Sequence, residues 1–292
     1  MNTSSDTPTT QSVHETVREG YSKIARGESS SCCGPAGGCG VASPDAAALA
    51  GHVGYDAAEL AALPDGTNLG LQCGNPTVLA ELKPGEVVLD LGSGAGLDVF
   101  VAGPKVGATG RVIGVDMTGD MLAKARKSLA TYRARTGLDN AEFRLGEIEH
   151  LPVADASVDV VISNCVLNLS PDKAQVWREI ARVLKPGGRV AVSDLALLQP
   201  LPANVMAMVE ALIGCVSGAQ LVTETEQMAR AAGLGNVQLT PKPDYVRAMT
   251  TFQDPLYRAI QDALPAGKTI ADYVTSLDVR ATKLVRRAAS CC

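Results

Sequence analysis

Short apolar runs alternate with helical segments between residues 86 and 194, and this alternation limits the possible folds most strongly. The runs are five or six residues long and lie at 86–91, 111–116, 141–145, 158–163 and 189–194. Continuous apolar runs of this length are typical of strands that helices cover on both faces. The sequence therefore predicts an α/β fold, a doubly wound and mostly parallel sheet with additions at both ends of the chain.

Two helices between these strands carry recognisable start signals. Thr118 can cap a helix that runs to about Thr136, with Met121 and similar apolar residues on one side. Ser170 and Pro171 are expected to begin a second helix, as its cap and its first helical position, and residues 185–188 should stop it.

The flanking segments carry weaker patterns. Residues 1–12 are predicted to be a disordered tail, and residues 14–26 have helical spacing of apolar side chains. A Gly/Ser/Cys loop at 29–40, short helices at 46–63, a helix at 204–215 and a β-like element at 237–239 are expected next. A basic helix-like run closes the chain, with residues Arg280, Lys283, Arg286 and Arg287.

The length and composition indicate one large domain or one domain with appendages. Its 292 residues, 46% of them hydrophobic, exclude wholesale disorder. We predict an N-terminal cysteine-containing segment (1–80), a central domain (81–240) and a small C-terminal subdomain (241–292). No apolar run is long enough for a membrane span, and no secretory signal is evident, which favours the cytoplasm. A net charge of −5 gives no electrostatic case for nucleic acid.

A glycine-rich turn follows the first predicted strand, in the sequence 90–96. It reads Asp-Leu-Gly-Ser-Gly-Ala-Gly, with Gly92, Gly94 and Gly96 in compact spacing and Asp90 two residues before the first glycine. Such glycines let the backbone pass close under a ligand and supply N–H donors. Asp116 closes the second predicted strand, where a carboxylate can accept both hydroxyls of a ribose.

The region 85–195 resembles the class I S-adenosylmethionine methyltransferases. The carrying motifs are the turn at 90–96, Asp116, the segment 146–152 and the segment 183–188, in that order. The resemblance implies that an acid after the third strand meets the adenine amino group and that an apolar residue packs on the ring; Glu147 and Ile148 occupy these places. The cofactor-binding residues that it implies are Asp90, Gly92, Gly94, Gly96, Asp116, Met117, Glu147, Ile148 and Asn164.

The eight cysteines are the unusual feature of the composition. They are too sparse for a small disulfide scaffold, and in a cytosolic chain thiols are expected to be reduced, so they are buried, metal-binding or catalytic. Cys165 lies where methyltransferases of this class present the acceptor, although a buried structural thiol is the alternative. Cys73 and Cys215 could fold over the same edge of the sheet, and three thiols there would form a soft-ligand site.

With these cysteines the chain resembles the arsenite methyltransferases over residues 13–240. The carrying segments are 68–76, 90–96, 114–118, 162–169 and 214–218. The resemblance implies that Cys73, Cys165 and Cys215 bind trivalent arsenic, the substrate. It also implies an N-terminal redox cysteine, for which Cys32, Cys33 and Cys39 are candidates; we favour the Cys32-Cys33 pair and assign the catalytic role to Cys33.

The predicted activity is S-adenosylmethionine-dependent methylation of arsenite in arsenic detoxification. Its expected partners are arsenite, methylated arsenicals and an external thiol reductant of the thioredoxin or glutathione type, and we expect a monomer. Two alternatives stay open. One is a methyltransferase for a small carbon or oxygen acceptor of the quinone or sterol type. The other is a non-enzymatic thiol protein that binds metalloids. The sequence assigns no role to Cys291 and Cys292.

Overall fold

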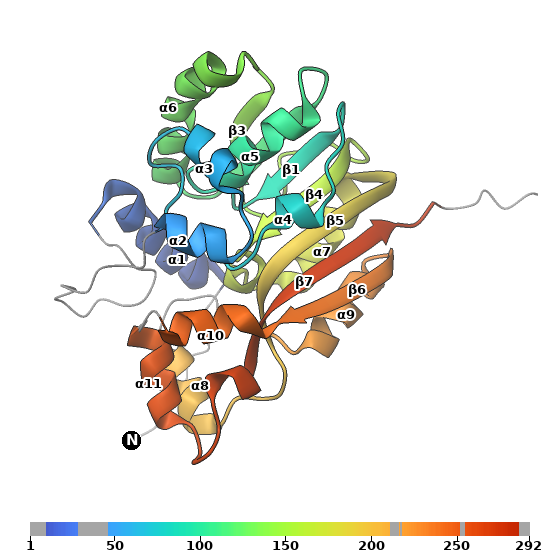
Figure 1. Cartoon of the computed structure of the whole chain (residues 1–292). Coiled ribbons are helices and arrows are strands. Elements are labelled where there is room, and N and C mark those ends of the chain that lie inside the picture. The colour runs from blue at the N-terminus through green and yellow to red at the C-terminus, as the bar shows by residue number, and fades with distance from the viewer. Residues whose placement is uncertain (1–9, 29–45, 211–215, 217, 252–254, 286–292) are drawn as a thin grey trace, which may run out of the picture.

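A seven-stranded sheet forms the centre of the protein in the computed structural model, which describes residues 10–28, 46–210, 216, 218–251 and 255–285 (Figure 1). Its strands are β1 (Val87–Leu91), β2 (Arg111–Asp116), β3 (Ala141–Leu145), β4 (Val158–Asn164), β5 (Leu184–Leu197), β6 (Leu234–Lys242) and β7 (Val274–Lys283). The order across the sheet is β3-β2-β1-β4-β5-β7-β6. The first five strands are parallel, and β7 is antiparallel to both of its neighbours.

Helices lie on both faces of this sheet, as a doubly wound fold requires. The helices of the described residues are α1 (Thr10–Arg26), α2 (Ala46–His52), α3 (Ala57–Ala62), α4 (Pro76–Leu79), α5 (Leu97–Val106), α6 (Gly119–Thr136), η1 (Leu167–Leu169), α7 (Lys173–Val183), α8 (Ala203–Glu210), α9 (Val222–Ala231), α10 (Pro243–Thr251), α11 (Pro255–Ala263) and η2 (Ile270–Asp272). All five predicted strands and the predicted class of fold are confirmed.

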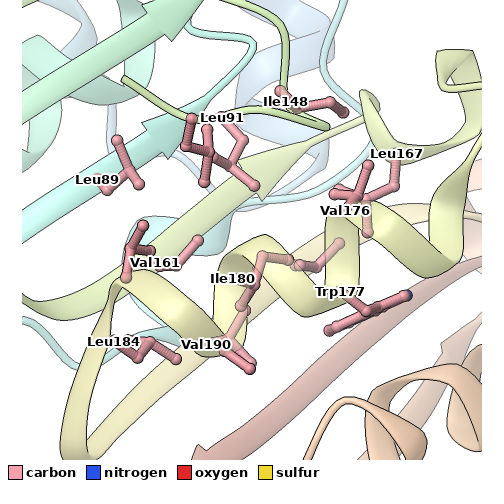
Figure 2. Close-up of a cluster of buried hydrophobic side chains, with 14 of the residues drawn as sticks. Leu89, Leu91, Ile148, Val161, Leu167, Val176, Trp177, Ile180, Leu184 and Val190 are labelled. Carbon is pink, nitrogen blue, oxygen red and sulfur yellow. The ribbon is translucent and has the colours of Figure 1, made fainter. Parts of the chain in front are cut away.

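Alternation along β4 shows how the sheet buries two faces. Val161 belongs to the apolar cluster under α7, whereas its neighbours Val160 and Ile162 belong to the cluster under α5 and α6. Successive side chains of a strand point to opposite faces, so an all-apolar strand needs helices on both sides. Figure 2 shows the first of these clusters, to which α7 contributes Val176, Trp177 and Ile180.

Helix α7 starts two residues later than the sequence predicts. Its cap is Asp172, whose carboxylate accepts the N–H of Gln175, and Pro171 lies outside the helix. Ser170 instead donates its hydroxyl to Glu149, a residue 21 positions earlier in the chain. A tertiary partner therefore replaced the local cap that the sequence favours. Thr118 does occupy the cap position of α6, although its side chain makes no capping hydrogen bond.

The ends of the chain differ from the predictions in two places. Helix α1 begins at Thr10, inside the stretch 1–12 that was expected to be a disordered tail. Arg280 and Lys283, from the basic run expected to be helical, lie in strand β7. That strand is inserted between β5 and β6 in the main sheet, because its alternating buried side chains complete the apolar clusters there. Arg286, Arg287 and the loop at 29–40 lie outside the described residues.

Helices α8, α10 and α11 gather at one end of the molecule, beyond the carboxyl end of β5 (Figure 1). A third apolar cluster joins them to the sheet, and it includes Val205, Val246, Ile260, Cys73 and Cys165. Among the described helices, none combines the length and the apolar character that crossing a membrane demands.

Candidate active site

An open cleft lies at the carboxyl ends of β1, β2 and β4, where ligands bind in folds of this kind. It encloses about 980 Å³ of space free of protein atoms, open solvent included. Seven of the nine predicted cofactor residues line it; they are Asp90, Gly92, Gly94, Asp116, Met117, Ile148 and Asn164. Gly96 and Glu147 lie outside the lining.

The glycine turn packs closely against its surroundings at Gly92 and leaves open space at Gly94. Gly92 has a φ of +64°, and a β-carbon there would come within 2.4 Å of the side chain of Val166. Gly94 has a φ of +50° and open space around the position of a β-carbon. The first glycine therefore allows close packing, and the second leaves room in the cleft beside the N–H groups of the turn.

Asp116 is joined to the glycine turn through its carboxylate. One oxygen accepts the N–H of Gly94 at 2.9 Å, and the other accepts the N–H of Thr118 at 2.7 Å. Burial raises the pKa of Asp116, and these two backbone donors lower it in part. The carboxylate keeps lone pairs that face the cleft, as a ribose-binding acid would need.

Two further buried acids line the cleft. Burial raises the pKa of Asp98 to about 6, against hydrogen bonds from Tyr55 and Asn164 that lower it. Burial, and then the charges of Asp98 and Asp116, raise the pKa of Asp90 well above its usual range. Buried carboxylates of like charge are unfavourable unless a cation offsets them. The sulfonium and ammonium groups of S-adenosylmethionine are such cations.

A buried hydroxyl in the glycine turn also fits a ligand. Within the described part of the chain, Ser93 Oγ is buried and has no hydrogen-bond partner, and Ser93 lines the cleft. Buried polar atoms are rarely left in this state, so the hydroxyl is consistent with a partner supplied by a bound molecule. Together with the acids, it shows that the residues present fit S-adenosylmethionine.

The residues expected at the adenine end are partly rearranged. Ile148 is buried and lines the cleft. Glu147 turns outward and pairs with Arg18 of helix α1, with 3.1 Å between Oε1 and Nη2. Glu149 lines the cleft in its place, and its Oε1 lies 3.1 Å from Nε2 of His14.

Helix α1 supplies one wall of the cleft, which the sequence did not reveal. His14, Val17 and Tyr21 lie one above the other on the same stripe of the helix, and all three line the cleft. Arg26 at the end of the helix forms an ion pair with Asp120 of α6 at 2.7 Å. The periodicity identified this helix, but its apolar stripe gave no signal of a ligand.

Two of the three predicted arsenic ligands meet at the cleft. Cys73 and Cys165 form a disulfide with their Cα atoms 6.0 Å apart, and Cys165 lines the cleft. Reduced thiols were expected from composition, so the oxidised pair differs from that expectation. Cys165 has a φ of +56°, and its N–H donates to the carbonyl of Ser193 at 2.8 Å. Sparsely populated backbone conformations of this kind gather at functional sites.

The other cysteines lie outside the described residues. These are Cys32, Cys33, Cys39, Cys215, Cys291 and Cys292. The third predicted ligand and the favoured redox residue, Cys33, therefore stay predictions.

A buried acid accompanies the two sulfur atoms. The ligand atoms of Cys73, Cys165 and Asp194 all lie within 4.8 Å of one another. Asp194 accepts hydrogen bonds from the side-chain amide of Asn168 at 2.8 Å and from the N–H of Leu195 at 2.8 Å. Burial raises its pKa to about 7. The sequence showed only an acid at the end of a strand.

A hydrogen-bond network joins the cleft to the loop that carries Cys73. The hydroxyl of Tyr55 donates to Asp98 at 2.6 Å, and the amide nitrogen of Asn164 lies 3.0 Å from that hydroxyl. The same nitrogen donates to the carbonyl of Gly74 at 2.9 Å, and Asn164 Oδ1 accepts the N–H of Cys73 at 3.1 Å. Asn164 therefore lies between the predicted donor and acceptor sites.

The comparisons with known proteins agree with this geometry. The family model described as "Methyltransferase domain" matches residues 82–233, about half of the chain. Together with the parallel sheet, the glycine turn and Asp116, it identifies a class I methyltransferase.

More specific relatives narrow the class. An arsenite methyltransferase of Halobacterium salinarum is 43% identical over 282 residues, 94% of this chain and 68% of the relative. The human arsenite methyltransferase is 39% identical over 151 residues, 50% of this chain and 40% of that protein. A crystal structure of an arsenic(III) S-adenosylmethionine methyltransferase from Chlamydomonas reinhardtii has a TM-score of 0.59 and 31% identity, covering 84% of this chain and 75% of the other. The chain belongs to the arsenite methyltransferase family, and the predicted enzyme class is confirmed.

Proposed function

We propose that this enzyme transfers a methyl group from S-adenosylmethionine to trivalent arsenic held by the thiolates of Cys73, Cys165 and Cys215. The observation that carries the proposal is the meeting of the first two sulfur atoms beside the cleft that fits the methyl donor. Arsenic detoxification is the purpose that such a reaction would serve.

In this proposal, different residues of the cleft bind different parts of the methyl donor. S-adenosylmethionine supplies an electrophilic methyl group on a positively charged sulfur. Asp90 and Asp98 offset the positive charge, Asp116 accepts the ribose hydroxyls, and Ile148 packs against the adenine ring. The apolar side chains of α1 keep water out on the opposite side.

The acceptor needs no general base. Trivalent arsenic bound by three thiolates keeps a lone pair, and a lone pair carries no proton to remove. Catalysis then consists of holding that lone pair in line with the methyl group and the departing sulfur. The left-handed backbone at Cys165 and the hydrogen bond from Cys73 to Asn164 fix two of the thiols for this purpose.

Each transfer must be followed by a reduction. The lone pair becomes the new arsenic–carbon bond, so arsenic rises from the trivalent to the pentavalent state. Two thiolates can return two electrons by forming a disulfide, and an external dithiol or two glutathiones then reduce that disulfide. The Cys73–Cys165 bond supports this part of the proposal, since these two sulfur atoms can pair.

The remaining parts of the proposal concern partners and place. We assign Cys33 to the redox relay, with Cys32 and Cys39 as the other candidates. The reductant would be of the thioredoxin or glutathione type, the products methylated arsenicals, the location the cytoplasm, and the enzyme a monomer.

The test uses the purified full chain with labelled S-adenosylmethionine, a thiol reductant and arsenite. We expect labelled methylated arsenic from the unchanged protein, and loss of both arsenite binding and methylation in Cys165→Ser. Cys292→Ser is the matched control for removal of a thiol and should retain activity. Undiminished methylation by Cys165→Ser would contradict the ligand assignment.

The same assay separates the two alternatives. Arsenite binding without methyl transfer would favour a metalloid-binding protein. Methyl transfer to a quinone but none to arsenite would favour a small carbon or oxygen acceptor.

A further inference from the structure

Strand β7, which lies next to the edge strand β6, carries buried polar side chains. Thr275 and Ser276 are fully buried, and Asp278 is 3% exposed. The strand lies between β5 and β6, so its backbone is paired on both sides. Buried polar side chains in such a strand need specific partners, because water is excluded. The partners of Ser276 and Asp278 include groups in the part of the molecule that carries the two cysteines.

The hydroxyl of Ser276 donates a hydrogen bond to the backbone carbonyl of Cys73 at 2.9 Å. The two residues are 203 positions apart in the sequence. This hydrogen bond therefore links the C-terminal strand to the loop that carries Cys73, the first of the proposed arsenic ligands. Loss of the hydroxyl would leave a buried carbonyl without this donor.

Ser193 of β5 forms the other half of the same support. Its carbonyl accepts the N–H of Cys165 and lies 3.5 Å from the sulfur of Cys73. Its hydroxyl donates to Asp278 of β7 at 2.7 Å, and the two residues are register partners. A β-carbon on Gly74 would come within 2.4 Å of Ser193, so the cysteine loop lies directly on this strand pair.

We infer that Ser276 is a positioning residue of the arsenic site, so that one side chain of the C-terminal strand β7 helps to place an arsenic ligand. This inference rests on the proposed function. The hydroxyl fixes the backbone of Cys73, and so holds its sulfur where Cys165 and the substrate can reach it. Residues beyond 233, where the matched methyltransferase domain ends, thus set the geometry of the acceptor.

The experiment compares Ser276→Ala with Thr275→Val in the reduced full-length chain. Thr275 is the matched control: it is equally buried in the same strand, and its hydroxyl donates to the carbonyl of Ser276 rather than to the cysteine loop. We expect Ser276→Ala to weaken arsenite binding about tenfold, the size of one buried hydrogen bond, with the dissociation constant of S-adenosylmethionine unchanged within about twofold. Thr275→Val should lower the melting temperature to a similar extent without changing arsenite binding.

A second readout reports the position of the thiols directly. The equilibrium of thiol–disulfide exchange between the Cys73–Cys165 pair and glutathione is measured by alkylating the free thiols and analysing the peptides by mass spectrometry. A looser loop lowers the effective concentration of one thiol at the other, so we expect Ser276→Ala to shift this equilibrium about tenfold, which is about 30 mV. Gly74→Ala, which would push the cysteine loop away from Ser193 beside that hydrogen bond, should shift it in the same direction if Ser276→Ala does not fold.

The outcomes separate this inference from the proposed function. Equal effects of Ser276→Ala and Thr275→Val on arsenite binding, or no effect of the first on either readout, would overturn the positioning role. Absence of arsenic methylation by the unchanged protein, together with a shifted disulfide equilibrium in Ser276→Ala, would overturn the proposed function but retain the support of Cys73 by β7.

Discussion

At the scale of single residues, Asp98 links the ionisation of the cleft to its ligand. Its folded-state pKa of about 6 lies above the ordinary value of 3.8 because the side chain is buried. An acid with a raised pKa destabilises the ligand-free fold increasingly as pH rises from about 4 to 6, and a bound cation offsets this loss. Stability and ligand binding should therefore respond to this carboxylate with opposite signs.

We expect S-adenosylmethionine binding to weaken as pH falls from 8 to 5, with most of the change near pH 6. Asp98→Asn should weaken binding at pH 8 by roughly ten- to a hundredfold, the size of one charge-assisted interaction, and should flatten the pH profile. The same variant should melt at a higher temperature than the unchanged protein at pH 8 without ligand. Calorimetric titration and thermal melts across pH measure these effects, and Asp65→Asn, at a fully exposed acid, is the control. An unchanged pH profile in Asp98→Asn would contradict the assignment.

The glycine turn offers a second test at this scale. Gly92→Ala should lower stability by about 1–3 kcal/mol, because its β-carbon would displace Val166 and its φ is positive. Gly94→Ala should lower stability less, since open space surrounds that position, but should weaken S-adenosylmethionine binding by filling the cleft. Urea unfolding of both variants measures the effect on packing, and ligand titration measures the effect on binding. Equal losses of stability in the two variants would contradict the separate roles assigned to the two glycines.

The sequence identified some residues of the site and missed others. Asp116 and the glycines belong to a local strand–turn–helix pattern, so their positions follow from spacing. Asp98 and Asp194 gave no signal, because an acid becomes a site residue only through partners elsewhere. Tyr55 lies 43 positions from Asp98, and Asn168 lies 26 positions from Asp194.

At the scale of elements, α1 is an ordinary amphipathic helix that also forms one wall of the cleft. Val17→Asp should weaken S-adenosylmethionine binding at least tenfold, since a buried charge would face the ligand and detach the helix. Thr16→Asp, one position away on the exposed face, should leave binding within about twofold. Hydrogen exchange of residues 10–26 should slow on ligand binding in the unchanged protein and in the control. Equal exchange with and without ligand would argue against α1 as a wall of the site.

Elements were predicted well where a local period decides them. The five parallel strands are apolar runs and α6 has apolar residues on one side, and they form as expected. The start of α7 was misplaced because Ser170 bonds to Glu149, a tertiary contact. β7 was mistaken for a basic helix, since Arg280 and Lys283 suggested an exposed face, whereas the strand is buried between two neighbours.

At the scale of the whole molecule, the C-terminal segment completes the sheet. β6 pairs only with β7 in the described sheet, and β7 pairs with β5 from Arg189 to Leu197. A chain that ends at residue 242 would expose the edge of β5 and leave β6 without a partner. We expect this truncated chain to aggregate or to unfold without cooperativity, measured by urea unfolding and sedimentation. Cooperative unfolding at the midpoint of the full chain would show that residues 243–292 are dispensable for the fold.

The sequence by itself determined the parallel core, the glycine turn with Asp116 and the set of cysteines, because periodicity and spacing are local properties of a chain. Only the tertiary structure decided that Cys73 meets Cys165 on a support formed by Ser193 and Ser276. It also decided that Asp98 lines the cleft and that α1 forms one of its walls. These features depend on side chains up to about two hundred positions apart, and long-range contacts of buried polar groups leave no period in the sequence.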